Sequence, residues 1–491
     1  MRHTNNQDSG QGSNPNAIVW VLSVAGITAA LMQTLVVPLI GDLPLLLDTD
    51  ASTAAWVITA TLLTSAVATP VSGRLGDLYG KRRVMLICAG ILVIGSVVCA
   101  LASTVVPMII GRGLQGVGMG MIPLGISAMR DLLPPERLGT SIALMSASMG
   151  VGGALGLPIA AAVAENSNWR MLFWGSTALA ALVFTLIWTL VPPTAISAQE
   201  GARFDPVGAL GLGAGLVALL LGVSKGADWG WGSAATLGCL LGAVVVLVAW
   251  GWFELRTPDP LVDLRITARP VVLLTNLASL VVGFAMYAQS LIIPQLMQLP
   301  EVTGYGLGLD MLEMGLWMAP GGFVMMLVSP LGAKVSRMRG PRITLALGAF
   351  VVSMGYVLAV LLMATAPGLL VAVCVCSAGV GLAYGAMPAL IMGSVPLSET
   401  ASANSFNTLS RAVGTSVAAA VVGVVLAQMT TTLGGREIPT EAGFQAGLLI
   451  GAGVALVAAM IALTIPSRAS RTAEERIDHP DQAPEVEPVA G

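Results

Sequence analysis

Long apolar segments separated by short polar clusters are the dominant pattern of this chain. A helix needs about 20 apolar residues to cross the hydrocarbon core of a bilayer. We find fourteen such segments along the 491 residues, and none shows the two-residue alternation of a membrane barrel. They lie near residues 18–40, 54–73, 84–102, 106–128, 140–164, 170–192, 207–224, 234–253, 270–297, 311–332, 343–364, 368–394, 403–428 and 444–466. We therefore predict an all-α integral membrane protein with about 14 transmembrane helices.

Composition agrees with a bilayer as the main partner. The chain is 55% hydrophobic and 10% charged, whereas soluble domains carry about 25% charged residues. A net charge of −3 gives no reason to expect a nucleic-acid partner. The histidines, His3 and His479, lie in the tails, and the five cysteines lie in apolar segments. We expect no metal site, no cofactor and no enzyme activity, and the absence of a G-x-x-x-x-G-K-[ST] sequence argues against direct drive by ATP.

Basic residues divide unequally between the two sides of the predicted membrane. Of the 23 lysines and arginines, 18 lie on the side of both tails, three lie on the opposite side, and Arg112 and Arg411 lie within spans. Positively charged loops are retained in the cytoplasm. We therefore expect a multi-pass protein of the plasma membrane with both termini in the cytoplasm.

Two sets of residues recur at nearly the same offset, 260 or 265 positions apart. The matched residues are Pro70 with Pro330, Gly80 with Gly340, Gly116 with Gly381, and Pro123 with Pro388. The repeat predicts two related six-helix bundles, at 17–192 and 270–466, with a two-helix insert and its loops at 193–269 between them. The tails, 1–16 and 467–491, are polar and are predicted to be disordered. Two repeated halves around a central site suit a transporter that exposes the site to each side in turn.

The segment between the second and third spans has the most specific sequence of the chain. Its members are Gly73, Arg74, Asp77, Gly80, Lys81, Arg82 and Arg83. We expect the glycines to supply positive φ angles and close approach in a tight turn. Asp77 is placed to accept hydrogen bonds from free backbone N–H groups at the start of a neighbouring helix. The alternative is a plain positive anchor at the membrane surface.

Charged and polar residues inside the spans are candidates for the transport pathway, because a charge in lipid is costly. Arg112 has two interpretations: a contact to substrate or coupled water, or a tie to backbone carbonyls of the first span. Gln115 lies one turn on, and either shares the polar pocket of Arg112 or makes a packing hydrogen bond between helices. Asn407 and Arg411 share one face of span thirteen, and either line the pathway or make an interhelical contact.

Glu313, near the start of span ten, also has two interpretations. With Asp310 it forms a helix cap, or it is the protonatable group that couples transport to a proton gradient. Methionines at 311, 314, 318, 325 and 326 are compatible with a broad apolar pocket or with ordinary packing.

Several of these motifs resemble the major facilitator superfamily. Gly73–Arg83 is similar to the signature loop of that superfamily, and Arg112-Gly113-Leu114-Gln115-Gly116 to its arginine motif. Gly152, Gly156 and Pro158 resemble the packing motif of its antiporters, although Leu157 stands where a proline is usual. With fourteen spans and Asn404-x-x-Asn407-x-x-x-Arg411, the resemblance is to the fourteen-helix drug:proton antiporter branch. That branch usually carries an aspartate in the first helix, where this chain has Met32.

The resemblance implies a secondary active transporter that exports amphipathic or hydrophobic small molecules, driven by the proton gradient. We expect a monomer. An alternative is a dedicated exporter of one metabolite or lipid with the same fold. A third, of another class, is a membrane sensor or scaffold that does not transport.

Overall fold

The computed structural model describes residues 14–36, 39, 43–194, 202–433 and 436–466. These residues form fourteen spans that are long and apolar enough to cross a membrane, which confirms the predicted fold class. The spans are α1 (Pro15–Thr34), α4 (Trp56–Tyr79), α5 (Lys81–Leu101), α6 (Val105–Gly118) with α7 (Met121–Leu132), α8 (Pro135–Asn166), α9 (Arg170–Leu190), α10 (Pro206–Trp229), α11 (Ala234–Glu254), α13 (Pro270–Gln298), α14 (Met311–Arg339), α15 (Pro341–Leu362), α16 (Ala366–Met392), α17 (Thr400–Gln428) and α18 (Glu441–Thr464).

Short elements connect the spans at the two ends of the molecule. They are α2 (Leu43–Leu46), α3 (Ala51–Ala54), α12 (Leu264–Thr267), the 3₁₀ turns η2 (Glu301–Thr303) and η3 (Leu397–Glu399), and the antiparallel strands β1 (Thr430–Leu433) and β2 (Arg436–Pro439).

The first span differs most from its predicted limits. It begins at Pro15, where the Asn14 side chain accepts a hydrogen bond from the backbone N–H of Asn16, and it ends at Thr34 instead of near residue 40. Proline at the first turn suits a helix start because its missing N–H would have no partner there. Most of the two predicted tails lies outside the described residues.

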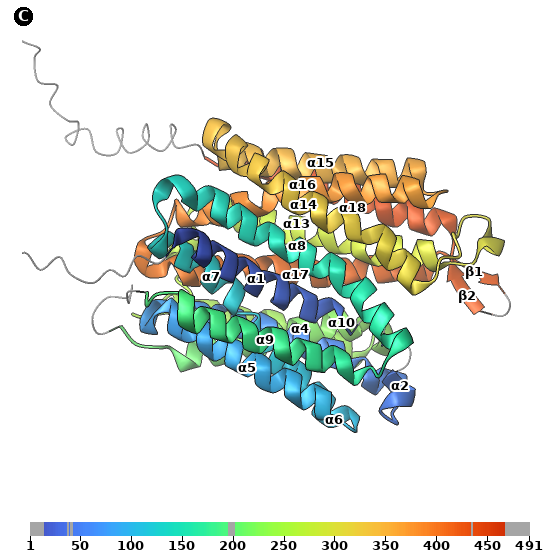
Figure 1. The fold of residues 1–491 in the computed structure, drawn as a ribbon, viewed down its shortest axis with the longest axis horizontal. Helices are drawn as coiled ribbons and strands as arrows, with labels where there is room; N and C mark the ends of the chain where they lie inside the picture. The colour runs from blue at the N-terminus through green and yellow to red at the C-terminus, as the bar shows by residue number, and fades with distance from the viewer. Residues whose placement is uncertain (1–13, 37–38, 40–42, 195–201, 434–435, 467–491) are drawn as a thin grey trace, which may run out of the picture.

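The helices pack into two bundles, each with its own apolar core (Figure 1). One core is formed by α1 and α4–α9, with Leu22, Leu92 and Phe173 among its buried side chains. The other is formed by α13–α18 and includes Tyr356 and Phe444. Interhelical contacts within each bundle depend on small residues, as expected where lipid surrounds the helices and close packing drives association.

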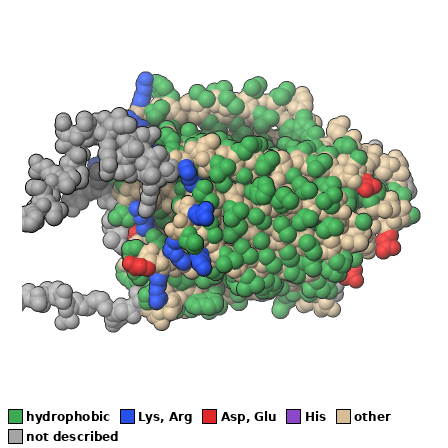
Figure 2. Space-filling view, turned by 90° about the horizontal axis from the view of Figure 1, so that it is seen from above, with side chains coloured by type: hydrophobic (Ala, Val, Ile, Leu, Met, Phe, Trp, Pro, Cys, Tyr) green, Lys and Arg blue, Asp and Glu red, His purple; other side chains and the backbone are tan. Residues whose placement is uncertain are grey.

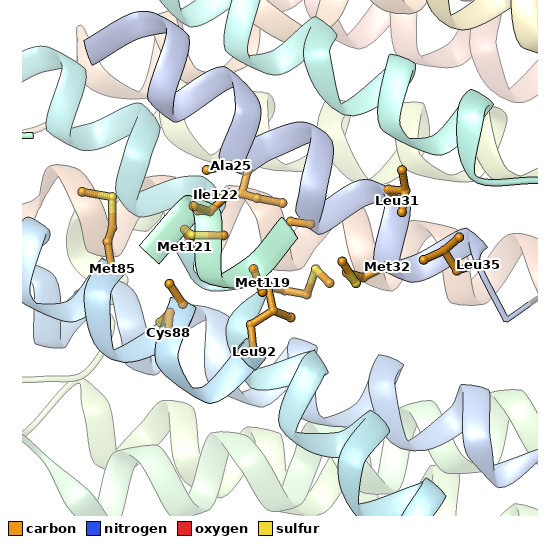
Figure 3. Close-up of a cluster of buried hydrophobic side chains, with 14 of the residues drawn as sticks. Ala25, Leu31, Met32, Leu35, Met85, Cys88, Leu92, Met119, Met121 and Ile122 are labelled. Carbon is orange, nitrogen blue, oxygen red and sulfur yellow. The ribbon is translucent and has the colours of Figure 1, made fainter. Parts of the chain in front are cut away.

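The fourth span is one membrane crossing made of two helices. Pro123 has no N–H to donate to the carbonyl of Met119, and glycines at 116, 118 and 120 weaken the same turn, so the helix breaks between α6 and α7. Near the break, Met119 lies beside Leu92 of α5, and Ile122 lies beside Ala25 of α1 (Figure 3). The matching Pro388 lies inside an unbroken α16.

The repeat found in the sequence corresponds to matching contacts in the two bundles. Gly80 and Gly340 both have positive φ, 92° and 87°. A methyl group at Gly116 would lie 2.5 Å from the Thr61 carbonyl oxygen on α4, and one at Gly381 would lie 2.5 Å from the Met325 carbonyl oxygen on α14. The repeated glycines therefore let the fourth span of each bundle approach the second.

The two inserted helices, α10 and α11, differ in how they contact the bundles. Leu212 and Leu216 of α10 pack with Leu63 of α4 and Leu409 of α17, so α10 contacts both bundles. By contrast, α11 presents exposed apolar side chains, including Val245 at 67% exposure, and packs mainly on α10. This distribution is what a helix facing lipid requires.

Lysine and arginine side chains gather at one end of the molecule, where α1 begins and α18 ends (Figure 2). The acidic side chains visible in that view lie mostly at the opposite end. We call these the basic end and the opposite end.

Candidate functional site

Asp77 links the two bundles at the basic end. Its carboxylate is fully buried and accepts the backbone N–H of Ala401 at 3.2 Å and that of Ser402 at 2.9 Å. Both N–H groups belong to the first turn of α17, where no carbonyl of the helix is available to them. The positive end of the helix dipole favours the negative charge at this place. The hydrogen bonds predicted for Asp77 are therefore present.

The backbone around Asp77 differs from the predicted turn. Residues 73–79 continue α4, so Gly73 and Gly76 are helical, and in this segment only Gly80 has positive φ. Gly73 and Gly76 serve close approach instead. A methyl group at Gly73 would overlap Ser405 and the Ala401 carbonyl of α17, and one at Gly76 would overlap Leu124 of α7.

The basic residues of this segment have separate partners. Lys81, fully buried, pairs with Asp131 at 2.7 Å. The Arg82 side chain donates to the Trp188 carbonyl oxygen at 2.5 Å. Arg74 is buried and its Nε has no acceptor among the described residues, while Arg83 is exposed. The segment thus ties α5 to α7 through Lys81 and to α9 through Arg82, while Arg74 is buried and Arg83 faces outward.

Further hydrogen bonds between the bundles lie at the same end. Arg130 Nη1 donates to Thr400 Oγ1 at 2.8 Å, and Ser127 Oγ donates to the Thr400 carbonyl at 3.2 Å. Where α14 meets α8, Arg337 Nη1 donates to Thr140 Oγ1 at 3.0 Å. Together with Asp77, these contacts hold the basic ends of the bundles against each other.

Arg112 is tied to backbone groups deep in the first bundle. Its Nη1 donates to the Met32 carbonyl of α1 at 2.9 Å and to Gln115 Oε1 at 2.7 Å, and its Nε donates to the Val57 carbonyl of α4 at 3.3 Å. Gln115 in turn donates to Ser96 Oγ at 2.9 Å. These contacts match the packing interpretation of Arg112. Met32, which stands at the position of the usual aspartate, supplies only its carbonyl.

The motif on α8 joins this helix to two neighbours. Methyl groups at Gly152 and Gly156 would overlap Ile27 and Thr34 of α1, and Pro158 contacts Gly315 of α14. The helix α8 therefore lies between the first helix of its own bundle and α14 of the other bundle.

A polar cluster occupies the interior of the second bundle. Asn407 Nδ2 donates to Asn276 Oδ1 at 2.9 Å and to Ser279 Oγ at 2.7 Å. One turn further on, the guanidinium of Arg411 lies 4.6 Å from the ring centroid of Tyr384. Sequence reasoning identified Asn407 and Arg411 but missed their partners. The polar run of Thr275, Asn276 and Ser279 in the first half of α13 was the available signal.

Asp310 and Glu313 form a capping box at the start of α14. Asp310 Oδ1 accepts the Glu313 N–H at 2.7 Å, and Glu313 Oε2 accepts the Asp310 N–H at 3.3 Å. This reciprocal pair satisfies two backbone donors at the helix start. The geometry matches the capping interpretation, and Glu313 is exposed at the opposite end, apart from Asp77, Arg112 and Arg411.

Comparison with known proteins decides the family. The sequence model of the Major Facilitator Superfamily matches residues 22–419. The chain belongs to this superfamily. As a member, it shares its arrangement of helices with the solved structure of the superfamily's proton:xylose symporter XylE. The TM-score is 0.63 with 14% sequence identity, and the match covers 92% of this chain and 96% of that chain.

Curated relatives in the superfamily are similar over part of their length. YhcA of Bacillus subtilis, an uncharacterized transporter, is 28% identical over 67% of this chain, and the chain spans only 60% of that relative. The multidrug resistance protein Stp of Mycobacterium tuberculosis is 28% identical over 76% of this chain and 68% of its own length. Membership of the superfamily rests on the match to its sequence model, and these relatives are similar to the chain over part of their length.

Proposed function

We propose that this protein exports amphipathic or hydrophobic small molecules by alternating access, driven by the proton gradient. The observation that supports this proposal is that Asp77 closes the basic end, where it binds the first turn of α17 across the two bundles. Two bundles held at one end by a small set of polar contacts can separate there and close elsewhere. The similarity to Stp supports drugs as the cargo.

We assign the basic end to the cytoplasm and the protein to the plasma membrane, with both termini inside. The supporting observation is the concentration of lysine and arginine at that end. In this orientation the Asp77 contacts close the cytoplasmic side. Arg112, Gln115 and Gly116 would keep α6 in register with α1 and α4 while the bundles move, and Gly152, Gly156 and Pro158 would keep α8 against α1 and α14.

The proposal is tested by deleting and restoring the gene in the native host and comparing susceptibility to a panel of drugs. Any compound that separates the strains is then assayed in proteoliposomes after a pH jump. We expect the compound to accumulate, and we expect this accumulation to collapse when a protonophore removes the proton gradient. Failure of every compound to accumulate would favour the non-transporting sensor or scaffold. Competition by unrelated dyes separates broad export from export of one metabolite or lipid, since a dedicated exporter should ignore most dyes.

Glu313 is the remaining candidate for the protonatable group, and its test is a single substitution. We expect Glu313→Gln to leave substrate-driven proton flux within about twofold of the native rate, because glutamine serves a capping box as well as glutamate does. Flux is measured with a pH-sensitive dye inside proteoliposomes. Loss of flux with unchanged thermal stability would instead identify Glu313 as the coupling group.

A further inference from the structure

The charges inside the membrane have one sign. In the fourteen spans, aspartate and glutamate occur only within about one turn of a helix end, as with Asp77, Asp131 and Glu313. Arg112 and Arg411 are the basic residues placed well inside spans. Removing a cation from water without an opposite charge is costly. The centre of the protein therefore carries positive charge that no carboxylate of these spans neutralises there.

The two arginines differ in how their donors are used. Arg112 is 2% exposed and donates to two backbone carbonyls and to Gln115. Arg411 is 8% exposed and donates to no group among the described residues. Its contact is the Tyr384 ring, which covers one face of the guanidinium. The face of an aromatic ring attracts a cation. It does not accept hydrogen bonds from the five N–H groups, which point outward in the plane of the guanidinium.

One donor beside Asn407, a turn before Arg411 on α17, is also unused. The Nδ2 group of Asn276 is buried and has no acceptor among the described residues, although its Oδ1 is occupied by Asn407. Buried donors without acceptors cost free energy, and nearly all are satisfied in native proteins. The cluster of Asn276, Asn407, Arg411 and Tyr384, which we call the α17 cluster, thus has more donors than acceptors.

The position of Arg411 suits a site on the transport pathway. It follows Thr400 by eleven residues, which is about 16 Å along the helix, near the middle of a hydrocarbon core of about 30 Å. Asn404, two turns earlier on the same face, donates to the Pro123 carbonyl of the other bundle at 3.4 Å. Arg411 therefore lies on the face of α17 that, two turns nearer the basic end, meets the other bundle through Asn404.

We propose that the α17 cluster binds an anionic group of the transported molecule, a carboxylate, sulfonate or phosphate. The guanidinium of Arg411 would receive two oxygens of the anion in a fork geometry, with Asn276 Nδ2 as a further donor. Tyr384 would contact the apolar body beside the anionic group. This inference rests on the proposed transport function and narrows its substrates to amphipathic anions, because a lipophilic cation would meet the charge of Arg411.

The test compares ligands that share one apolar body and differ in charge. The native protein in lipid nanodiscs is titrated with naphthoate, naphthalenesulfonate, naphthyl phosphate and naphthylmethylammonium. We expect at least one anion to bind more tightly than the ammonium. Arg411→Gln should weaken that anion by about tenfold to a hundredfold, the effect of losing a hydrogen bond to a charged group. Arg411→Lys should retain part of the affinity, since it keeps the charge but loses the fork.

Ser410→Ala is the matched control, because its hydroxyl donates only within α17, to the Phe406 carbonyl. It should bind every ligand as the native protein does. Tighter binding of the ammonium than of all three anions, absence of binding by any anion, or anion binding that Arg411→Gln leaves unchanged would overturn the proposal. The comparison among ligands in the native protein needs no variant. It therefore tests the preference for anions over the ammonium even if Arg411→Gln does not fold.

Transport assays on the same ligands distinguish failure of the anion-site proposal from failure of the proposed export function. Arg411-dependent binding of an anion that proteoliposomes never accumulate would support the α17 cluster and contradict export. Gradient-driven accumulation of the ammonium alone would support export and contradict the anion site.

Discussion

Replacing Asp77 with asparagine is expected to stop transport while the protein remains folded in the membrane. Asparagine keeps one acceptor but loses the negative charge that the first turn of α17 binds through Ala401 and Ser402. Hydrogen bonds to a charged group contribute about 1.5–3 kcal/mol each. The state closed at the basic end should therefore fall in population by about tenfold or more. Transport is measured as substrate accumulation in proteoliposomes, and folding as a single peak in size-exclusion chromatography.

Glu136→Gln is the control for this substitution. Glu136 is exposed in the first turn of α8, at the same end of the molecule, so the change removes one carboxylate without touching α17. It should transport at the native rate. If Asp77→Asn also transports at that rate, the contacts to Ala401 and Ser402 are packing alone and the role assigned to Asp77 in alternating access is wrong.

Gly116→Ala and Gly381→Ala are expected to destabilise the two bundles by similar amounts. Each new methyl group would lie 2.5 Å from a backbone carbonyl oxygen, that of Thr61 or that of Met325, so a whole helix must move. Overpacking of this kind costs about 1–3 kcal/mol. Because the two glycines are related by the internal repeat, their effects should match. The measurement is the thermal unfolding midpoint of the purified protein in detergent.

Gly113→Ala and Gly423→Ala serve as controls with the same change in volume. A methyl group at Gly113, one turn before Gly116, meets only Thr64 at 3.6 Å, and one at Gly423 meets nothing within 4 Å. Both should be neutral or slightly stabilising, since alanine favours a helix more than glycine does. Equal destabilisation by Gly113→Ala and Gly116→Ala would show that the close approach of α6 to α4 at Gly116 is not what makes the substitution costly.

The Asp77 contact shows what can be predicted from the residues near it in the sequence. A lone carboxylate among cations beside a tight turn indicated a helix start as its partner, because helix starts have free N–H groups wherever they occur. The sequence did not identify α17, since Ala401 lies 324 residues away. It also assigned positive φ to Gly73 and Gly76, whereas α4 continues through both. Gly80 alone ends the helix there.

Arg112 and Arg411 show where sequence reasoning stops. Both are arginines inside apolar spans, and the sequence left a packing role and a pathway role open for each. In the structure Arg112 donates to the carbonyls of Met32 and Val57, whereas Arg411 lies against the Tyr384 ring and donates to no group in the described part of the chain. Carbonyls are present at every residue, and nothing near Arg411 in the sequence shows that α16 places Tyr384 against it, so neither arrangement could be predicted from the sequence.

The sequence by itself determined the number and order of the spans, the two related bundles and the end at which basic residues gather. It could do so because the bilayer imposes a length on every crossing and a cost on every charge, and both are visible along the chain. The tertiary structure decided which helices the motifs join, that α10 contacts both bundles, and that Arg411 donates to no group among the residues that the structure describes. These depend on contacts between distant segments, whose geometry arises only when the two bundles pack.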